Sequence, residues 1–166
     1  MAQSALLIAS HNTGKVRELA SLLASKRIQL LFPENVHFPE PEENGQSYEE
    51  NAIIKAVSAS RFTMKAAIAD DCGMEISGLG NMPGHHSKRY AFEFGSWHLA
   101  MKEFYRLLGG RESVSTFHCG LALAWPTGRF VSVTATVTGV FVAPRGELGF
   151  GYDPCFLPTG STMIFS

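Results

Sequence analysis

The chain has 166 residues, of which 45% are hydrophobic and 17% are charged. A length near ~150 residues is typical of one folded domain, and the composition excludes disordered and fibrous proteins. Fourteen basic and fifteen acidic residues give a formal charge of −1, so the chain lacks the overall positive charge with which proteins bind duplex nucleic acid.

The cysteines and the N-terminal apolar run bear on location. Cys72, Cys119 and Cys155 are widely spaced and form no C-x-x-C pair, which favours a reducing, cytoplasmic location over a disulfide or zinc framework. The apolar run at residues 5–9 is far shorter than the roughly 20 residues that a membrane span needs. We therefore expect a cytoplasmic protein with no membrane or polynucleotide partner.

The first predicted unit is a strand, a polar loop and a helix. Residues 5–9 form a continuous apolar run that predicts a buried strand, and turn-forming residues follow it. Val16, Leu19 and Leu23 then recur at the spacing of one helical face, which predicts a helix over residues 15–26. Residues 29–32 indicate a second strand.

A polar loop and a second helix follow. Residues 33–45 contain prolines and glutamates and are too polar for a core. Ser47 and Glu50 have the spacing of a capping box, which predicts that a helix begins there.

The third predicted strand covers residues 66–69 and ends at the acidic pair Asp70 and Asp71. Two adjacent carboxylates cannot both point into an apolar core. We therefore expect them at the C-terminal edge of a sheet, where ligands of α/β proteins collect.

The C-terminal half changes pattern. Glycines at 78–84 predict a sharply bent loop, and apolar residues between Trp97 and Leu108 predict an amphipathic helix whose aromatic stripe belongs to the core. Residues 117–125 and 131–138 predict a hairpin, the second strand alternating valine or alanine with serine or threonine so that one face is wet.

Residues 10–15 are the first candidate for chemistry. Hydroxyl, amide, glycine and lysine side chains between a buried strand and a helix N-terminus are suited to hold a phosphate. The loop is not a Walker A motif, because Ala9 stands where glycine is required and Val16 stands where serine or threonine would hold magnesium. The alternative is that Asn12 or Thr13 only caps the helix.

Two further groups of residues could serve a nucleotide. The acids of the polar loop and of the third strand are hard oxygen ligands suited to magnesium, although those of the loop could simply be a solvated charge run. Residues 149–154 form an aromatic-glycine loop that could stack on a base or could be a tight turn. The neighbouring His85 and His86 share no face and do not predict a metal site. The acids are Glu40, Glu42, Glu43, Asp70 and Asp71.

Together and in this order, four segments resemble the inosine triphosphate pyrophosphatase family, also called Ham1-like, whose members hydrolyse non-standard purine nucleoside triphosphates such as ITP, dITP and XTP. The segments are SHNTGKVRELASLL at 10–23, SYEENAIIKA at 47–56, ADDCGMEISGLGNMPGHHSKRYA at 69–91 and GFGYDP at 149–154. Ordered motifs over nearly the whole chain are far more specific than any one of them.

The resemblance implies a fold and a set of roles. The fold is a single α/β domain over residues 1–166, with a mixed twisted sheet, flanking helices and two lobes around a substrate cleft. Asp71 binds Mg²⁺ and is the general base, and Glu42 completes the metal site, with Glu43 as the rival. We expect Lys15 and Asp71 to meet across one groove. The substrate-binding residues are Ser10, His11, Asn12, Thr13, Gly14, Lys15, Lys55, Cys72, Phe150, Gly151, Tyr152 and Asp153.

The resemblance also implies a homodimer. This sequence departs from the family pattern in two places. Cys72 stands where the family usually has a serine that touches substrate. The family continues with a lysine and a Ser-His-Arg motif that contact the base, and residues 161–166 resemble only the start of that segment, so we expect weakened base specificity. Two alternatives stay open: a catalytically impaired nucleotide-binding relative, and a Maf-type pyrophosphatase of modified pyrimidine nucleotides.

Overall fold

The computed structural model describes residues 5–146 and 149–165, so Ser166 of the terminal segment lies outside it. The chain divides into two compact units, unit 1 being Met1–Asp71 with Cys119–Thr134 and unit 2 being Cys72–His118 with Ala135–Ser166. Among the described helices, none is long and apolar enough to cross a membrane.

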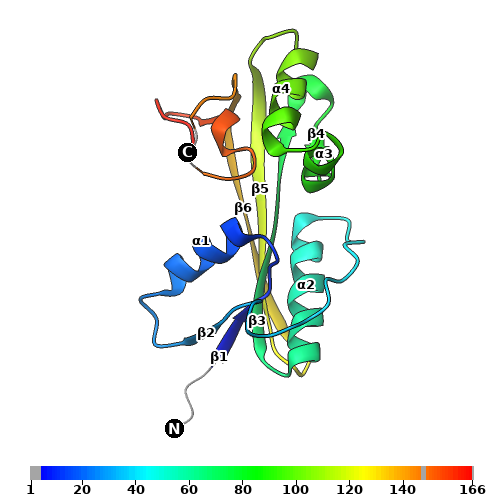
Figure 1. The fold of residues 1–166 in the computed structure, drawn as a ribbon, viewed down its shortest axis with the longest axis vertical. Helices are drawn as coiled ribbons and strands as arrows, with labels where there is room; N and C mark the ends of the chain where they lie inside the picture. Colours follow the sequence, from blue (N-terminus) through cyan, green and yellow to red (C-terminus); the bar gives the residue numbers. More distant parts are fainter. Residues whose placement is uncertain (1–4, 147–148, 166) are drawn as a thin grey trace. The chain divides into compact units, whose positions relative to one another are not determined.

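The elements alternate between strands and helices before they become mainly strands (Figure 1), and a mixed sheet with flanking helices was the predicted fold class. The sheet has the strand order β2-β1-β3-β5-β6-β7, with β4 also paired to β3. β1 is parallel to β2 and β3, whereas β4 is antiparallel to β3 and β7 to β6. The elements are β1 (Ala5–Ile8), α1 (Thr13–Leu23), β2 (Gln29–Leu31), α2 (Tyr48–Thr63), β3 (Ala66–Ile76), a 3₁₀ turn (Ser77–Leu79), β4 (Met82–Gly84), α3 (Ser87–Glu93), α4 (Trp97–Leu107), β5 (Ser113–Ala124), β6 (Phe130–Phe141), a second 3₁₀ turn (Asp153–Cys155) and β7 (Phe156–Pro158).

In unit 1, β1 and β3 bury both of their faces. Successive side chains of a strand point to opposite faces. One buried cluster includes Leu7 and Ala67 and packs against α2, and the other includes Ile68 and packs against α1. Figure 1 shows α1 and α2 on the two sides of these strands. By the same alternation, Asp70 continues the α1 face of β3 and Asp71 continues the α2 face.

The prediction that the third strand ends before its aspartates is wrong. β3 runs through Asp70 and Asp71 to Ile76, and both aspartates are buried. The strand can carry them because each carboxylate is paired with a lysine, which offsets the cost of burying its charge. The two acids therefore lie inside the sheet, on opposite faces of one strand.

The start of α2 agrees with the sequence pattern, whereas α1 (Thr13–Leu23) begins and ends earlier than the predicted range 15–26. Ser47 caps α2, its hydroxyl accepting a hydrogen bond from the N–H of Glu50 at 3.1 Å. The Glu50 carboxylate accepts from the N–H of Gln46 at 2.6 Å, one residue earlier than in an ideal capping box. The predicted start of the second helix is thus confirmed.

In unit 2, the predicted amphipathic helix is α4, and its stripe does form core. Met101 and Phe104 are buried in one cluster with Phe141 and Tyr152. The sequence pattern did not indicate α3, which precedes it (Ser87–Glu93).

The predicted hairpin is present as β5 and β6, but the valine face of β6 is wet. Ser132 donates a hydrogen bond to Glu49 of α2, so the neighbouring side chains point away from that helix. Val131 and Val133 are 56% and 59% exposed. The alternating pattern predicted the strand correctly, but residues 133–138 are exposed on both of its faces and not on one alone.

Candidate active site

The loop between β1 and α1 is a helix cap. The side-chain oxygen of Asn12 accepts hydrogen bonds from the backbone N–H groups of Gly14 at 2.9 Å and Lys15 at 3.4 Å. The Ser10 hydroxyl accepts from the N–H of Asn12 at 3.3 Å. The capping interpretation of this loop is confirmed, and phosphate binding by its N–H groups stays a prediction.

The side chains of this loop reach two parts of unit 1. The ammonium of Lys15 lies 2.7 Å from a carboxylate oxygen of Asp70. The ring of His11 packs on buried Phe38, with ring centroids 4.7 Å apart, and Thr13 is exposed. Lys15 was expected to meet Asp71. Its ion pair is instead with Asp70, because neighbouring side chains of β3 point to opposite faces.

Asp71 is held by two residues of α2. Lys55 Nζ lies 2.8 Å from Asp71 Oδ1, and the Asn51 amide donates to Asp71 Oδ2 at 3.3 Å. Asn51 and Lys55 are four residues apart, so they share one face of α2. Both oxygens of this carboxylate are engaged, which fixes its orientation.

The acidic loop contributes to the same cluster through Glu43. Its carboxylate lies 3.4 Å from Lys55 Nζ, so Glu43 and Asp71 reach the same cation. Glu42 is exposed. Across residues 5–146 and 149–165, no group of three or more His, Cys, Asp and Glu side chains could by itself hold a metal ion.

The predicted residues of unit 2 are Cys72 and residues 150–153. Tyr152 lies in the core, 3% exposed, and its hydroxyl donates to the carbonyl of Ser87 at 3.1 Å. The Asp153 carboxylate accepts from the N–H of Phe150 at 2.8 Å, and burial raises the pKa of this carboxyl above its usual value. Cys72 is partly buried. Their roles toward a nucleoside stay predictions.

Gly149 and Gly151 let this loop turn back on itself. Both have positive φ, at 78° and 61°. A Cβ on Gly149 would lie 2.7 Å from an oxygen of the Asp153 carboxylate, so the turn needs glycine there. The tight-turn interpretation of this segment is confirmed.

Sequence reasoning missed one pairing and one residue of the cluster. Asp70 was considered only as a metal-binding acid, and its pairing with Lys15 links elements far apart in the chain. Asn51 lies inside the quoted motif 47–56 but received no role. Its spacing of four residues from Lys55 was the available signal, because residues at that spacing share a helix face.

Known proteins are similar in sequence to nearly the whole of this chain. The model of the Ham1 family matches residues 6–166. A dITP/XTP pyrophosphatase of Gluconobacter oxydans is 38% identical over 165 residues, covering 98% of this chain and 79% of that protein. One of Geobacillus kaustophilus is 42% identical over 168 residues, covering 95% and 81%.

Solved structures agree with the sequence matches. A Ham1 protein of Staphylococcus aureus superposes with a TM-score of 0.80 at 30% identity, covering 98% of this chain and 85% of that one. A HAM1 protein of Coxiella burnetii gives a TM-score of 0.78 at 32% identity, covering 93% and 81%. With the family model matched from Leu6 to the last residue, and relatives this similar over most of their length, the chain belongs to the Ham1 family.

Proposed function

We propose that the protein is a pyrophosphatase of non-standard purine nucleoside triphosphates, such as ITP, dITP and XTP. Relatives that cover nearly the whole chain are named dITP/XTP pyrophosphatases. The observation that carries the proposal is the cluster in unit 1, where two lysines are held by two adjacent aspartates. Ammonium groups that are positioned beside carboxylates suit a polyphosphate and a general base.

The proposed reaction is attack of water on the α-phosphorus. The new bond joins the water oxygen to that phosphorus, and the bond from the α-phosphorus to the bridging oxygen of the β-phosphate breaks. The products are a nucleoside monophosphate and pyrophosphate. Asp71 takes the proton of the attacking water, because its carboxylate is held in one orientation by Lys55 and Asn51.

The lysines and the loop between β1 and α1 are proposed to hold the phosphates. Lys15 and Lys55 offset phosphate charge, while residues 10–14 offer hydroxyl groups, the His11 ring and the N-terminus of α1. Each lysine is paired with a carboxylate in the structure, so each exchanges that partner, in whole or in part, for a phosphate oxygen when substrate binds.

The acids of this cluster are oxygen donors of the kind that magnesium prefers. Magnesium is commonly bound by one or two carboxylates, with water and phosphate oxygens completing its six ligands. Glu43 and Asp71 both reach the Lys55 ammonium, so two hard oxygen donors converge on one cationic position. We propose that they hold Mg²⁺, which when bound would neutralise charge on the phosphates. Glu42, which the sequence analysis expected to bind the metal, is exposed, and its role stays a prediction.

The nucleoside is proposed to lie against residues of unit 2. Phe150 is partly buried in a turn and offers a ring for stacking, and Gly151 allows a close approach of the backbone. Cys72, at the family's serine position, offers a weaker hydrogen bond than a hydroxyl.

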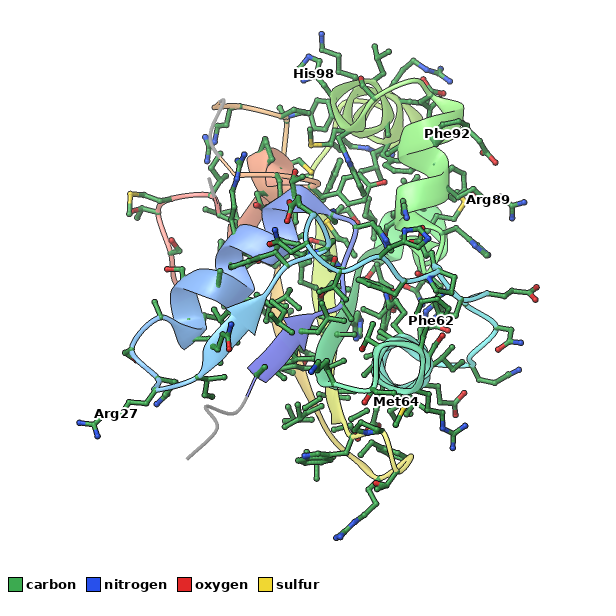
Figure 2. The ribbon with its side chains drawn as sticks, turned by 60° about the horizontal axis from the view of Figure 1, so that its bottom comes forward. Arg27, Phe62, Met64, Arg89, Phe92 and His98 are labelled. Atoms are coloured by element: carbon green, nitrogen blue, oxygen red, sulfur yellow. The ribbon has the colours of Figure 1, made fainter. Side chains whose placement is uncertain are left out.

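We also propose that the protein is a homodimer and acts in the cytoplasm. Residues of α2 and of the β5–β6 turn line a groove that includes Ile54, Val57 and Phe130. Figure 2 shows Phe62 and Met64 at the end of α2, and they are 58% and 68% exposed. A second copy would cover this surface, and light scattering would give the mass.

Three free cysteines suit a reducing compartment.

The activity is tested with a panel of nucleotides. Folded protein and Mg²⁺ are incubated with dITP, XTP, dATP, dGTP and methylated UTP and CTP, and pyrophosphate is measured. We expect release from dITP and XTP. Absence of release from every nucleotide would overturn the proposal, and calorimetry would then show whether the chain only binds nucleotides. Release confined to the methylated pyrimidines would favour the Maf-type alternative.

A further inference from the structure

Asn51 is a buried polar residue in the first turns of α2, and it connects two parts of the candidate site. Asn51 is only 4% exposed. The amide nitrogen donates to Asp71 Oδ2 at 3.3 Å, and the amide oxygen accepts from the N–H of Gly45 at 2.8 Å. One side chain therefore touches both β3 and the acidic loop.

The contact with the loop is close. A Cβ on Gly45 would lie 2.7 Å from the Asn51 side-chain oxygen and 2.9 Å from the Asn51 backbone nitrogen. Real Cβ atoms do not approach so closely, so the loop lies against α2 only because residue 45 is glycine. Glu43, two residues earlier, reaches Lys55 at 3.4 Å.

The contact with Asp71 complements that of Lys55. Lys55 engages Oδ1 and Asn51 engages Oδ2, so rotation of the carboxylate would break one of the two bonds. An amide can donate to a carboxylate and accept from a backbone N–H at the same time, and it does so without adding a charge. An aspartate at position 51 would keep the acceptor, but it would place a second negative charge against Asp71.

We infer that Asn51 is a positioning residue that sets the orientation of Asp71 and the distance of the acidic loop from it. The inference rests on the proposed function, because the orientation matters only where Asp71 binds metal and accepts a proton. Partners of this kind, which orient a metal ligand, typically change metal affinity or activity by about 10–100-fold when they are removed.

The test uses the full chain, with Mn²⁺ as the metal probe. Asn51→Ala should weaken Mn²⁺ binding, measured by electron paramagnetic resonance, and should lower kcat for dITP by about 10–100-fold while KM changes little. Asn51→Asp should lower kcat as much as Asn51→Ala, although it can still accept from Gly45. Wild-type kcat in Asn51→Asp would overturn the inference, because the residue would then act only on the loop.

Ser60→Ala is the matched control. Ser60 is another buried polar residue of α2, 0% exposed, and its hydroxyl donates to the carbonyl of Lys65 at 2.6 Å, away from the acids. We expect this control to lose stability while keeping wild-type Mn²⁺ affinity and kcat. If Asn51→Ala behaves like the control in both measurements, Asn51 is structural and the inference is wrong.

Failure of the proposed function would look different. Wild-type protein would then release no pyrophosphate from any nucleotide, while the Mn²⁺ titration would still report whether Asn51 orients Asp71. An active wild-type enzyme whose metal affinity and kcat are unaffected by Asn51→Ala would contradict the inference alone.

Discussion

The motif residues of unit 1 and those of unit 2 use their polar groups differently. In unit 1, the Asp71 carboxylate is held by two side chains, the ammonium of Lys55 and the amide of Asn51. In unit 2, the Tyr152 hydroxyl and the Asp153 carboxylate bond to backbone groups and hold a turn on an aromatic core. The comparison teaches that the polar residues of one family pattern can pair with other side chains in one place and with the backbone in another.

The largest effect expected is on activity, from Asp71→Asn. The amide keeps the shape of the carboxylate but cannot take a proton, so kcat should fall by roughly 10²–10⁴-fold. Lys55 retains Glu43 as a partner, so the melting temperature should change little. Steady-state kinetics and thermal unfolding measure the two effects. If the variant is unfolded, or is as active as wild type, then Asp71 does not serve activity rather than stability, and the comparison between the two units fails.

Lys55→Met should have the next largest effect. The methionine keeps most of the volume but removes the cation that Asp71 and Glu43 share, so kcat/KM should fall by roughly 10²-fold. The same substitution at Lys65, outside the site, is the control and should leave kcat/KM unchanged. An equal loss from both lysines would mean that general surface charge, and not the cluster, attracts the nucleotide.

Tyr152→Phe should affect stability and not chemistry. It removes the hydrogen bond to Ser87 but keeps the ring packed edge-on to Trp97, so the free energy of unfolding should fall by about 1 kcal/mol. Urea denaturation measures the loss. If stability is unchanged and kcat/KM for dITP drops, Tyr152 belongs to the nucleoside pocket and the comparison between the two units fails.

The smallest effect concerns a thiol beside the same turn. Cys155 is buried, and burial raises the pKa of its thiol, so little reactive thiolate exists at neutral pH. Iodoacetamide should modify Cys72 and Cys119 in the native protein and Cys155 only after urea unfolding, as mass spectrometry would show. Early modification of Cys155 would indicate that the turn opens readily.

Local patterns predicted much of the fold. The apolar runs and helical spacings of unit 1, the Ser47 cap and the stripe of α4 all depend on residues close in sequence. The third strand was ended too early because a buried aspartate is costly unless a partner is present. The partners, Lys15 and Lys55, come from helices on opposite faces and cannot be seen in the strand itself.

The same limit applies to the candidate site. The sequence pattern included Lys55 and Asp71 but not the pairing between them, because that pairing depends on how α2 crosses β3. It also gave Asn51 no role, although the residue stands inside a quoted motif. β6 shows the converse error: alternation predicted one wet face, whereas residues 133–138 are exposed on both faces, because burial depends on what packs over a strand and not on its own residues.

Asp70 and Asp71 are consecutive residues of β3, so the partner that each one meets depends on the register of that strand. Deleting one residue from 66–69 would move every later side chain to the other face. Asp71 would then point toward α1 and Asp70 toward α2, with each charge beside the wrong helix. A single-codon deletion there should therefore be far more damaging than most substitutions at the same positions, even though it removes none of the charged residues.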